Sequence, residues 1–163
     1  MTEIGTLDLS TGRVLDAPPE EAWRAWIEPE QVARWWGPAG FTVPLADLDV
    51  REGGTSLLCM RAPAEYGGTD HWNTWTYRSI TPYERIEFDL AFTAADRSPV
   101  SPPPGVPERV PHVVTLSPRA GGRTELTVTE RGYRTDEARA LSLAGLEQCL
   151  DKMAAMFPAR TAG

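Results

Sequence analysis

The sequence predicts an α+β fold in which an antiparallel sheet receives one long C-terminal helix. Between residues 41 and 133, apolar residues recur at every second position in segments separated by turns that contain Gly or Pro. This alternation is typical of strands with one buried face, and short connections make neighbouring strands antiparallel. Residues 135–157 instead carry apolar side chains at helical spacing. A half-apolar sheet and a half-apolar helix together predict a two-layer domain.

The first part of the chain predicts one strand followed by two short helices. Residues 7–17 have strand character, which the turn-prone residues 10–12 are expected to interrupt. One helix is expected after Pro18-Pro19 and another from Pro29, because proline in the first helical turn loses no hydrogen bond. The second helix is expected to end at Gly37-Pro38.

Hairpins are expected to build the rest of the sheet. On the strand that follows the Gly67-Gly68 turn, the alternation places His71 and Tyr77 on one face and Ile80 on the other. The strand with the most regular alternation comes next along the chain. The expected strands cover about 41–50, 55–61, 71–80, 86–92, 112–117 and 124–133.

A proline-rich segment, about residues 93–111, separates two of these strands. It contains six prolines, so too many backbone donors are missing for a central strand. A loop of this length in a small domain is typical either of a lid or of a disordered connection, and the sequence leaves both open.

The last helix is expected to organise the fold. Thr135 or Asp136 can cap its first turn, and Pro158 ends it. Its charged side, with Lys152, is expected to face solvent. Its other side is expected either to pack on the sheet or to form the wall of a cavity; that side carries Ala138, Leu141, Gly145, Leu146, Cys149, Leu150, Met153 and Phe157.

Composition excludes several classes of function. The net charge of −7 argues against a nucleic-acid partner, because binding to phosphates requires an excess of Lys and Arg. No apolar stretch is long enough to insert into a membrane, and Met1–Gly5 do not begin a targeting segment, so a cytoplasmic protein is expected. Cys59 and Cys149 are expected to be buried, reduced thiols. One domain, residues 1–163, is expected.

Catalytic and metal-binding motifs are missing from the sequence. There are two histidines, and there is no Cys-x-x-Cys, His-Glu-x-x-His or Asp-rich calcium pattern, so neither a metal nor another cofactor is expected. There is also no Gly-x-Ser-x-Gly elbow, and no catalytic residue is assigned.

The aromatic content suggests a binding cavity instead. Six tryptophans, all within the first 75 residues, are suited to an apolar pocket and equally suited to a plain core. The strand face around residues 71–77 combines aromatic and hydrogen-bonding groups, and it is expected to be either a pocket wall or solvated surface. The candidate cavity residues are Trp35, His71, Asn73, Trp75, Tyr77, Phe88, His112, Leu146, Cys149, Leu150 and Met153.

Several segments together resemble a known family. They are residues 16–26 (DAPPEEAWRAW), 29–38 (PEQVARWWGP), 49–54 (DVREGG), 80–86 (ITPYERI) and 145–150 (GLEQCL). They are similar to homologues of the activator of the heat-shock-protein-90 ATPase, within the START-like SRPBCC superfamily.

The resemblance, which covers about residues 13–157, implies a helix-grip fold. In that fold a curved antiparallel sheet wraps around the C-terminal helix, two short helices close one end, and a cavity lies between them. Two departures are relevant: Leu146 stands where the family usually has Trp, which could widen a pocket, and the proline-rich insertion is long. The superfamily shares no catalytic set that could be carried over to this chain.

Three functions follow as hypotheses. The first is non-catalytic binding of a small hydrophobic or aromatic molecule, oriented by His71, Asn73, Tyr77 or His112. The second is an enzyme of the cyclase or aromatase type that acts on a polyketide-like substrate. The third is a module that interacts with a chaperone. A homodimer is compatible with all three.

Overall fold

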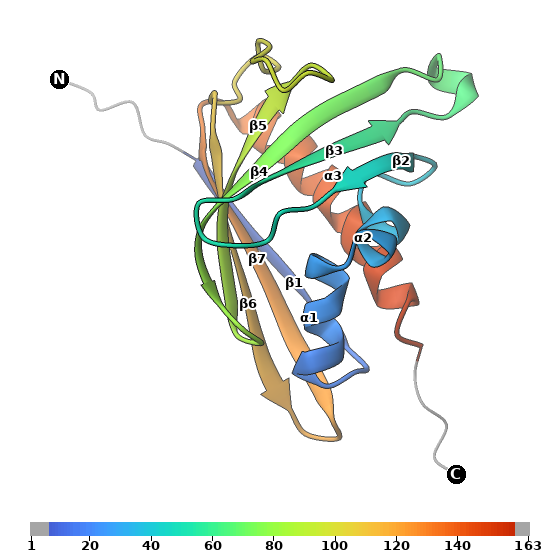
Figure 1. The fold of residues 1–163 in the computed structure, drawn as a ribbon, viewed down its shortest axis with the longest axis vertical. Helices are drawn as coiled ribbons and strands as arrows, with labels where there is room; N and C mark the ends of the chain where they lie inside the picture. Colours follow the sequence, from blue (N-terminus) through green and yellow to red (C-terminus); the bar gives the residue numbers. More distant parts are fainter. Residues whose placement is uncertain (1–6, 159–163) are drawn as a thin grey trace, which may run out of the picture.

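Seven strands form one antiparallel sheet in the computed structural model, which describes residues 7–158 (Figure 1). Met1–Gly5, where no targeting segment was expected, lie outside the described residues. The sheet order is β1-β7-β6-β5-β4-β3-β2, so hairpins join all neighbours except β1 and β7, as the alternation predicted. The strands are β1 (Leu7–Leu15), β2 (Thr42–Asp47), β3 (Thr55–Arg61), β4 (Asp70–Thr81), β5 (Arg85–Thr93), β6 (Val110–Arg119) and β7 (Arg123–Tyr133).

The helices lie on one side of this curved sheet (Figure 1). Both short helices begin at a proline, and Thr135 Oγ1 caps the long helix by accepting a hydrogen bond from the Ala138 amide at 3.1 Å. The predicted helix-grip α+β fold is therefore confirmed. None of the helices within residues 7–158 has the length and apolar character needed to cross a membrane. The helices are α1 (Pro19–Ile27), α2 (Pro29–Trp35), the short 3₁₀ helix η1 (Ala64–Tyr66) and α3 (Asp136–Ala155).

Three details of the strands differ from the sequence prediction. β1 continues through residues 10–12, because Gly12 pairs closely with β7, where a Cβ would overlap the Leu126 carbonyl oxygen. β6 begins at Val110, before the predicted start. A bulge between Tyr77 and Ser79 shifts β4, so Ile80 lies opposite the buried Ile86 and packs against the core instead of facing outward.

Tryptophans fill the centre of the domain. Trp75 stacks on Phe88 with ring centroids 4.7 Å apart, and Trp36 meets Trp75 edge-on at 5.0 Å. Trp26 and Trp35 lie 4.5 Å apart beside them. Burial of large aromatic rings in offset and edge-on arrangements is a major source of core stability. Most of the aromatic surface is therefore used in packing.

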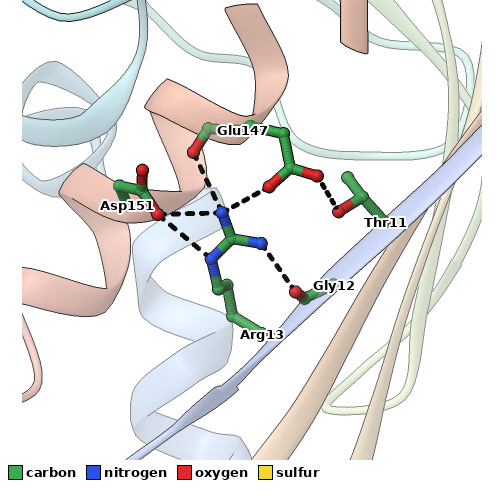
Figure 2. A network of polar contacts seen from close by, with 5 residues as sticks. All are labelled: Thr11, Gly12, Arg13, Glu147 and Asp151. Carbon is green, nitrogen blue, oxygen red and sulfur yellow. Dashed lines mark hydrogen bonds and ion pairs between the residues drawn. The ribbon is translucent and has the colours of Figure 1, made fainter. Parts of the chain in front are cut away.

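A polar network holds α3 against β1 (Figure 2). The Arg13 guanidinium donates to Glu147 Oε2 at 2.5 Å and to Asp151 Oδ1 at 2.8 Å, and the Thr11 hydroxyl donates to Glu147 Oε1 at 2.6 Å. Arg13 and Thr11 lie on the sheet face that α3 covers, and Arg13 is only 24% exposed. The charged side of α3 was expected to face solvent, but part of it is bound to the sheet edge.

Two further residues of α3 differ from the prediction. Lys152 donates to a group of backbone carbonyls after α2, with the closest contact of 3.0 Å to the Gly37 oxygen, so it is not a freely solvated side chain. Burial lowers the pKa of its ammonium group. Leu141, expected on the apolar face, is 68% exposed and lines the hollow beneath the proline-rich segment.

The proline-rich segment packs against the N-terminal end of α3. The Arg134 amide donates to the Gly105 carbonyl oxygen at 2.8 Å. Gly105 has a φ of +80°, and a Cβ there would overlap Thr135 and Ala138. Val106 follows directly and reaches the space between the sheet and α3. This arrangement places the segment over one side of that space.

Candidate functional site

A partly open cavity of about 160 Å³ lies between the sheet and α3. Its wall is almost entirely apolar. Three of its residues, Phe92, Val106 and Ser142, also line an adjoining hollow beneath the proline-rich segment. The cavity is lined by Trp36, Gly37, Pro38, Met60, Leu90, Phe92, Val106, Val110, His112, Glu130, Tyr133, Ser142, Gly145, Leu146 and Cys149.

The sequence candidates divide into three groups. His112, Leu146 and Cys149 line the cavity. His71 is exposed and lines a separate hollow beside the proline-rich segment. The others are buried in the core and do not line the cavity, because neighbouring side chains already surround them; they are Trp35, Asn73, Trp75, Tyr77, Phe88, Leu150 and Met153.

The inward face of β4 carries three of the candidates that do not line the cavity. Asn73, Trp75 and Tyr77 do share the inward face, but Trp75 is covered by aromatic rings and Tyr77 donates to or accepts from the Ser56 hydroxyl at 2.8 Å. Burial raises the pKa of Tyr77 to about 12. These side chains belong to the core and do not line the cavity.

The polar part of the cavity wall comes from two paired strands. His112 of β6 and Glu130 of β7 are opposite one another in register, and both point to the buried face. His112 Nε2 lies 3.2 Å from Glu130 Oε2, and the two residues are 5% and 6% exposed. The Tyr133 hydroxyl donates to Glu130 Oε1. We call His112, Glu130 and Tyr133 the polar cluster.

Charge pairing determines the ionisation of this polar cluster. Burial disfavours the charged imidazole, but the Glu130 carboxylate more than compensates and raises the pKa of His112. Burial likewise opposes ionisation of Glu130, but His112 and Tyr133 lower the pKa of this carboxyl below its ordinary value. Burial and the Glu130 charge raise the pKa of Tyr133. All three directions favour an imidazolium–carboxylate pair with a neutral phenol.

Both ring nitrogens of His112 are already engaged. Nδ1 lies 2.9 Å from the Val110 carbonyl oxygen, and because a carbonyl can only accept, Nδ1 must carry a proton. Nε2 faces Glu130. The ring also stacks on Phe88 with centroids 4.7 Å apart. Neither nitrogen is free to take a proton from a substrate.

Sequence reasoning missed Glu130 and Tyr133. The available signal was a single ionisable residue in each of two otherwise apolar alternations: His112 between Val110 and Val114, and Glu130 after Val128. When opposite charges occupy such positions in consecutive strands, cross-strand pairing is a testable expectation.

The other side chains near the cavity provide neither an activated nucleophile nor a set of metal ligands among the described residues. Burial raises the pKa of the Cys149 thiol to about 11, so it is not a thiolate nucleophile near neutral pH. Among residues 7–158, no three His, Cys, Asp or Glu side chains gather as metal ligands would.

Comparison with known proteins identifies the family. A model of the family described as Activator of Hsp90 ATPase homolog 1-like protein matches residues 16–158. The chain belongs to this family. No curated protein matches the sequence.

Several solved structures share the fold. A protein of Chromobacterium violaceum is 29% identical with a TM-score of 0.76, and the match covers 95% of this chain and 98% of that one. A protein of Arthrobacter aurescens is 24% identical with a TM-score of 0.77, covering 98% and 92% respectively. A Silicibacter pomeroyi protein titled as a member of the same family is 21% identical with a TM-score of 0.75, covering 92% and 96%. Fold and family thus agree with the resemblance in the sequence.

Proposed function

We propose that the protein binds a small hydrophobic or aromatic molecule in the cavity between the sheet and α3. The observation that carries this proposal is an apolar cavity of about 160 Å³ with a single polar cluster in its wall. Apolar cavities of about 150 Å³ accommodate a benzene ring in proteins. Apolar surface buried on binding supplies the affinity, and a few polar groups fix the orientation.

Cavity size separates this proposal from the enzyme hypothesis. A single aromatic ring matches the volume of the cavity itself, whereas the long reactive chain of a polyketide-like substrate would also have to occupy the adjoining hollow. A cyclase also needs a group that moves protons, and both nitrogens of His112 are occupied. The geometry therefore favours binding over turnover.

The family description favours a second candidate, stimulation of a chaperone ATPase. This role uses an outer surface and does not require the cavity. Measuring the ATPase rate of Hsp90 with and without the protein separates the two: stimulation that is unchanged by filling the cavity supports the chaperone role, and no stimulation contradicts it.

Filling the cavity should weaken ligand binding strongly. Leu146 lines the cavity from α3, so Leu146→Trp adds a bulky ring to a space of about 160 Å³. We expect the affinity for toluene to fall at least about tenfold, because the ring takes the place of the ligand. The dissociation constant is measured by protein-observed NMR titration, and the melting temperature confirms folding.

Ala144→Trp is the matched control for this variant. Ala144 is an exposed residue of the same helix and lies outside the cavity wall, so the same bulk is added without filling the cavity. We expect Ala144→Trp to bind toluene like the wild type. Equal affinity in wild type and Leu146→Trp would show that toluene binds elsewhere, and no binding to the wild type at millimolar concentration would contradict the proposed function.

A further inference from the structure

The donors of the polar cluster are all engaged, whereas some of its acceptor positions are not. Every donor of the polar cluster is engaged: His112 Nδ1 donates to the Val110 carbonyl, Nε2 faces Glu130, and the Tyr133 hydroxyl donates to Glu130. Ser142, the hydroxyl on α3 that also lines the cavity, is within hydrogen-bonding reach of Tyr133. No N–H or O–H of the polar cluster is left for a ligand.

The Glu130 carboxylate can still accept hydrogen bonds. A carboxylate offers about four lone-pair positions. Glu130 uses one oxygen for His112 and the other for Tyr133, so each oxygen can accept one further hydrogen bond. Glu130 belongs to the cavity wall, and its charge makes it a stronger acceptor than a neutral group.

This imbalance discriminates between classes of ligand. An anionic ligand, such as a carboxylate, would meet Glu130 without any free donor or unpaired cation, since His112 already balances that charge. A cationic ligand would lose its hydration in an apolar space where the only anion is already paired. A neutral ring with a donor loses little hydration and gains a charge-assisted hydrogen bond.

We infer that the ligand is an uncharged single-ring aromatic molecule carrying an O–H or N–H group that donates to Glu130. This inference rests on the proposed function, because it specifies which molecules the same cavity selects. It also excludes aromatic carboxylates, which the apolar wall and volume alone do not exclude.

Three probes test the inference on the full chain: phenol, toluene and benzoate. Phenol and toluene have nearly the same shape, and they differ by a hydroxyl in place of a methyl group. Burying a hydroxyl without a partner is unfavourable, so a cavity without a free acceptor prefers toluene by about tenfold or more. We expect phenol to bind wild type at least as tightly as toluene, and benzoate to bind at least about tenfold more weakly than phenol. Dissociation constants come from protein-observed NMR titrations at pH 7.

A double variant, His112→Leu with Glu130→Leu, assigns the preference to the polar cluster. Replacing both members of a buried ion pair with apolar residues is compatible with folding. With Tyr133→Phe also introduced, so that the hydroxyl freed from Glu130 cannot bind phenol instead, we expect the ratio of phenol to toluene affinity to shift by about tenfold or more in favour of toluene. A ratio equal to that of the wild type would overturn the role of Glu130. If the double variant fails to fold, the comparison of probes on the wild type still decides the inference.

The outcomes separate the two proposals. If toluene binds wild type tenfold more tightly than phenol, or benzoate binds best, the inference is wrong and the proposed function stands. If none of the three probes binds, the proposed function is wrong and the inference fails with it.

Discussion

Replacing Trp75 by alanine is expected to lower the free energy of unfolding by about 3–5 kcal/mol. Trp75 has no exposed surface, and its ring stacks on Phe88 and meets Trp36 edge-on. Removing the ring leaves a large void among rigid aromatic neighbours that cannot collapse into it. Chemical denaturation followed by circular dichroism measures the loss.

Trp72→Ala on the same strand is the control. Trp72 lies three positions before Trp75, and an odd separation places two side chains on opposite faces of a strand. Trp72 is also only partly buried. The expected loss is clearly smaller for this variant. A loss below about 1 kcal/mol for Trp75→Ala would show that the tryptophan cluster relaxes into the space and that its packing is looser than described.

Replacing Glu130 alone by leucine is expected to cost about 3–5 kcal/mol, because it leaves the His112 imidazole buried without its counter-charge. The Tyr133 hydroxyl also loses its acceptor. Denaturant unfolding of the single and double variants measures the effect. The double variant with His112→Leu should recover the part of the loss that comes from the unpaired charge, since an apolar pair replaces the ion pair. The Tyr133 hydroxyl still lacks its acceptor in that variant. If the double variant is as unstable as the single one, the cost arises from altered packing and the lost Tyr133 hydrogen bond and not from an unpaired charge.

The same ion pair should make stability depend on pH. The pKa of His112 is raised in the folded state, so its contribution is complete below the unfolded value of about 6.5 and is lost as pH rises through the folded value. The pKa of Glu130 is lowered, so its contribution is complete above about 4.3 and is lost as pH falls through the folded value. The difference in melting temperature between wild type and double variant should be largest between these values and shrink above pH 6.5. A difference that is constant from pH 5 to 9 would contradict the charged state of the pair.

The fold was predictable because its signals are local. Alternating apolar residues determine which face of a strand is buried, and prolines and Thr135 mark where helices begin. The bulge after Tyr77 was not predictable, because it depends on how β4 pairs with β5. It reversed the expected orientation of Ile80.

The cavity was predictable only in part. Periodicity identified both Trp75 and His112 as inward positions. It does not reveal that aromatic rings pack against Trp75, whereas His112 borders the cavity. Glu130 was missed because its partner on the neighbouring strand was not considered together with it. How deeply a side chain is buried and which residue it faces on the next strand depend on the packed structure. The alternation within a single strand does not determine either.

The backbone carbonyls that bind Lys152 make this residue a probe of how often the end of α3 opens. Lys152 is the single lysine of the sequence, so an endoprotease specific for lysine has one cleavage site, and it lies in the last turns of α3. Its ammonium group is held by the Trp36, Gly37 and Phe41 carbonyls, and a protease can engage the site only after α3 detaches from the segment that follows α2. The rate at which the chain is cut into two fragments therefore measures how often the last turns of α3 open. A molecule that occupies the neighbouring cavity and holds α3 in place should slow that rate, whatever its chemical identity.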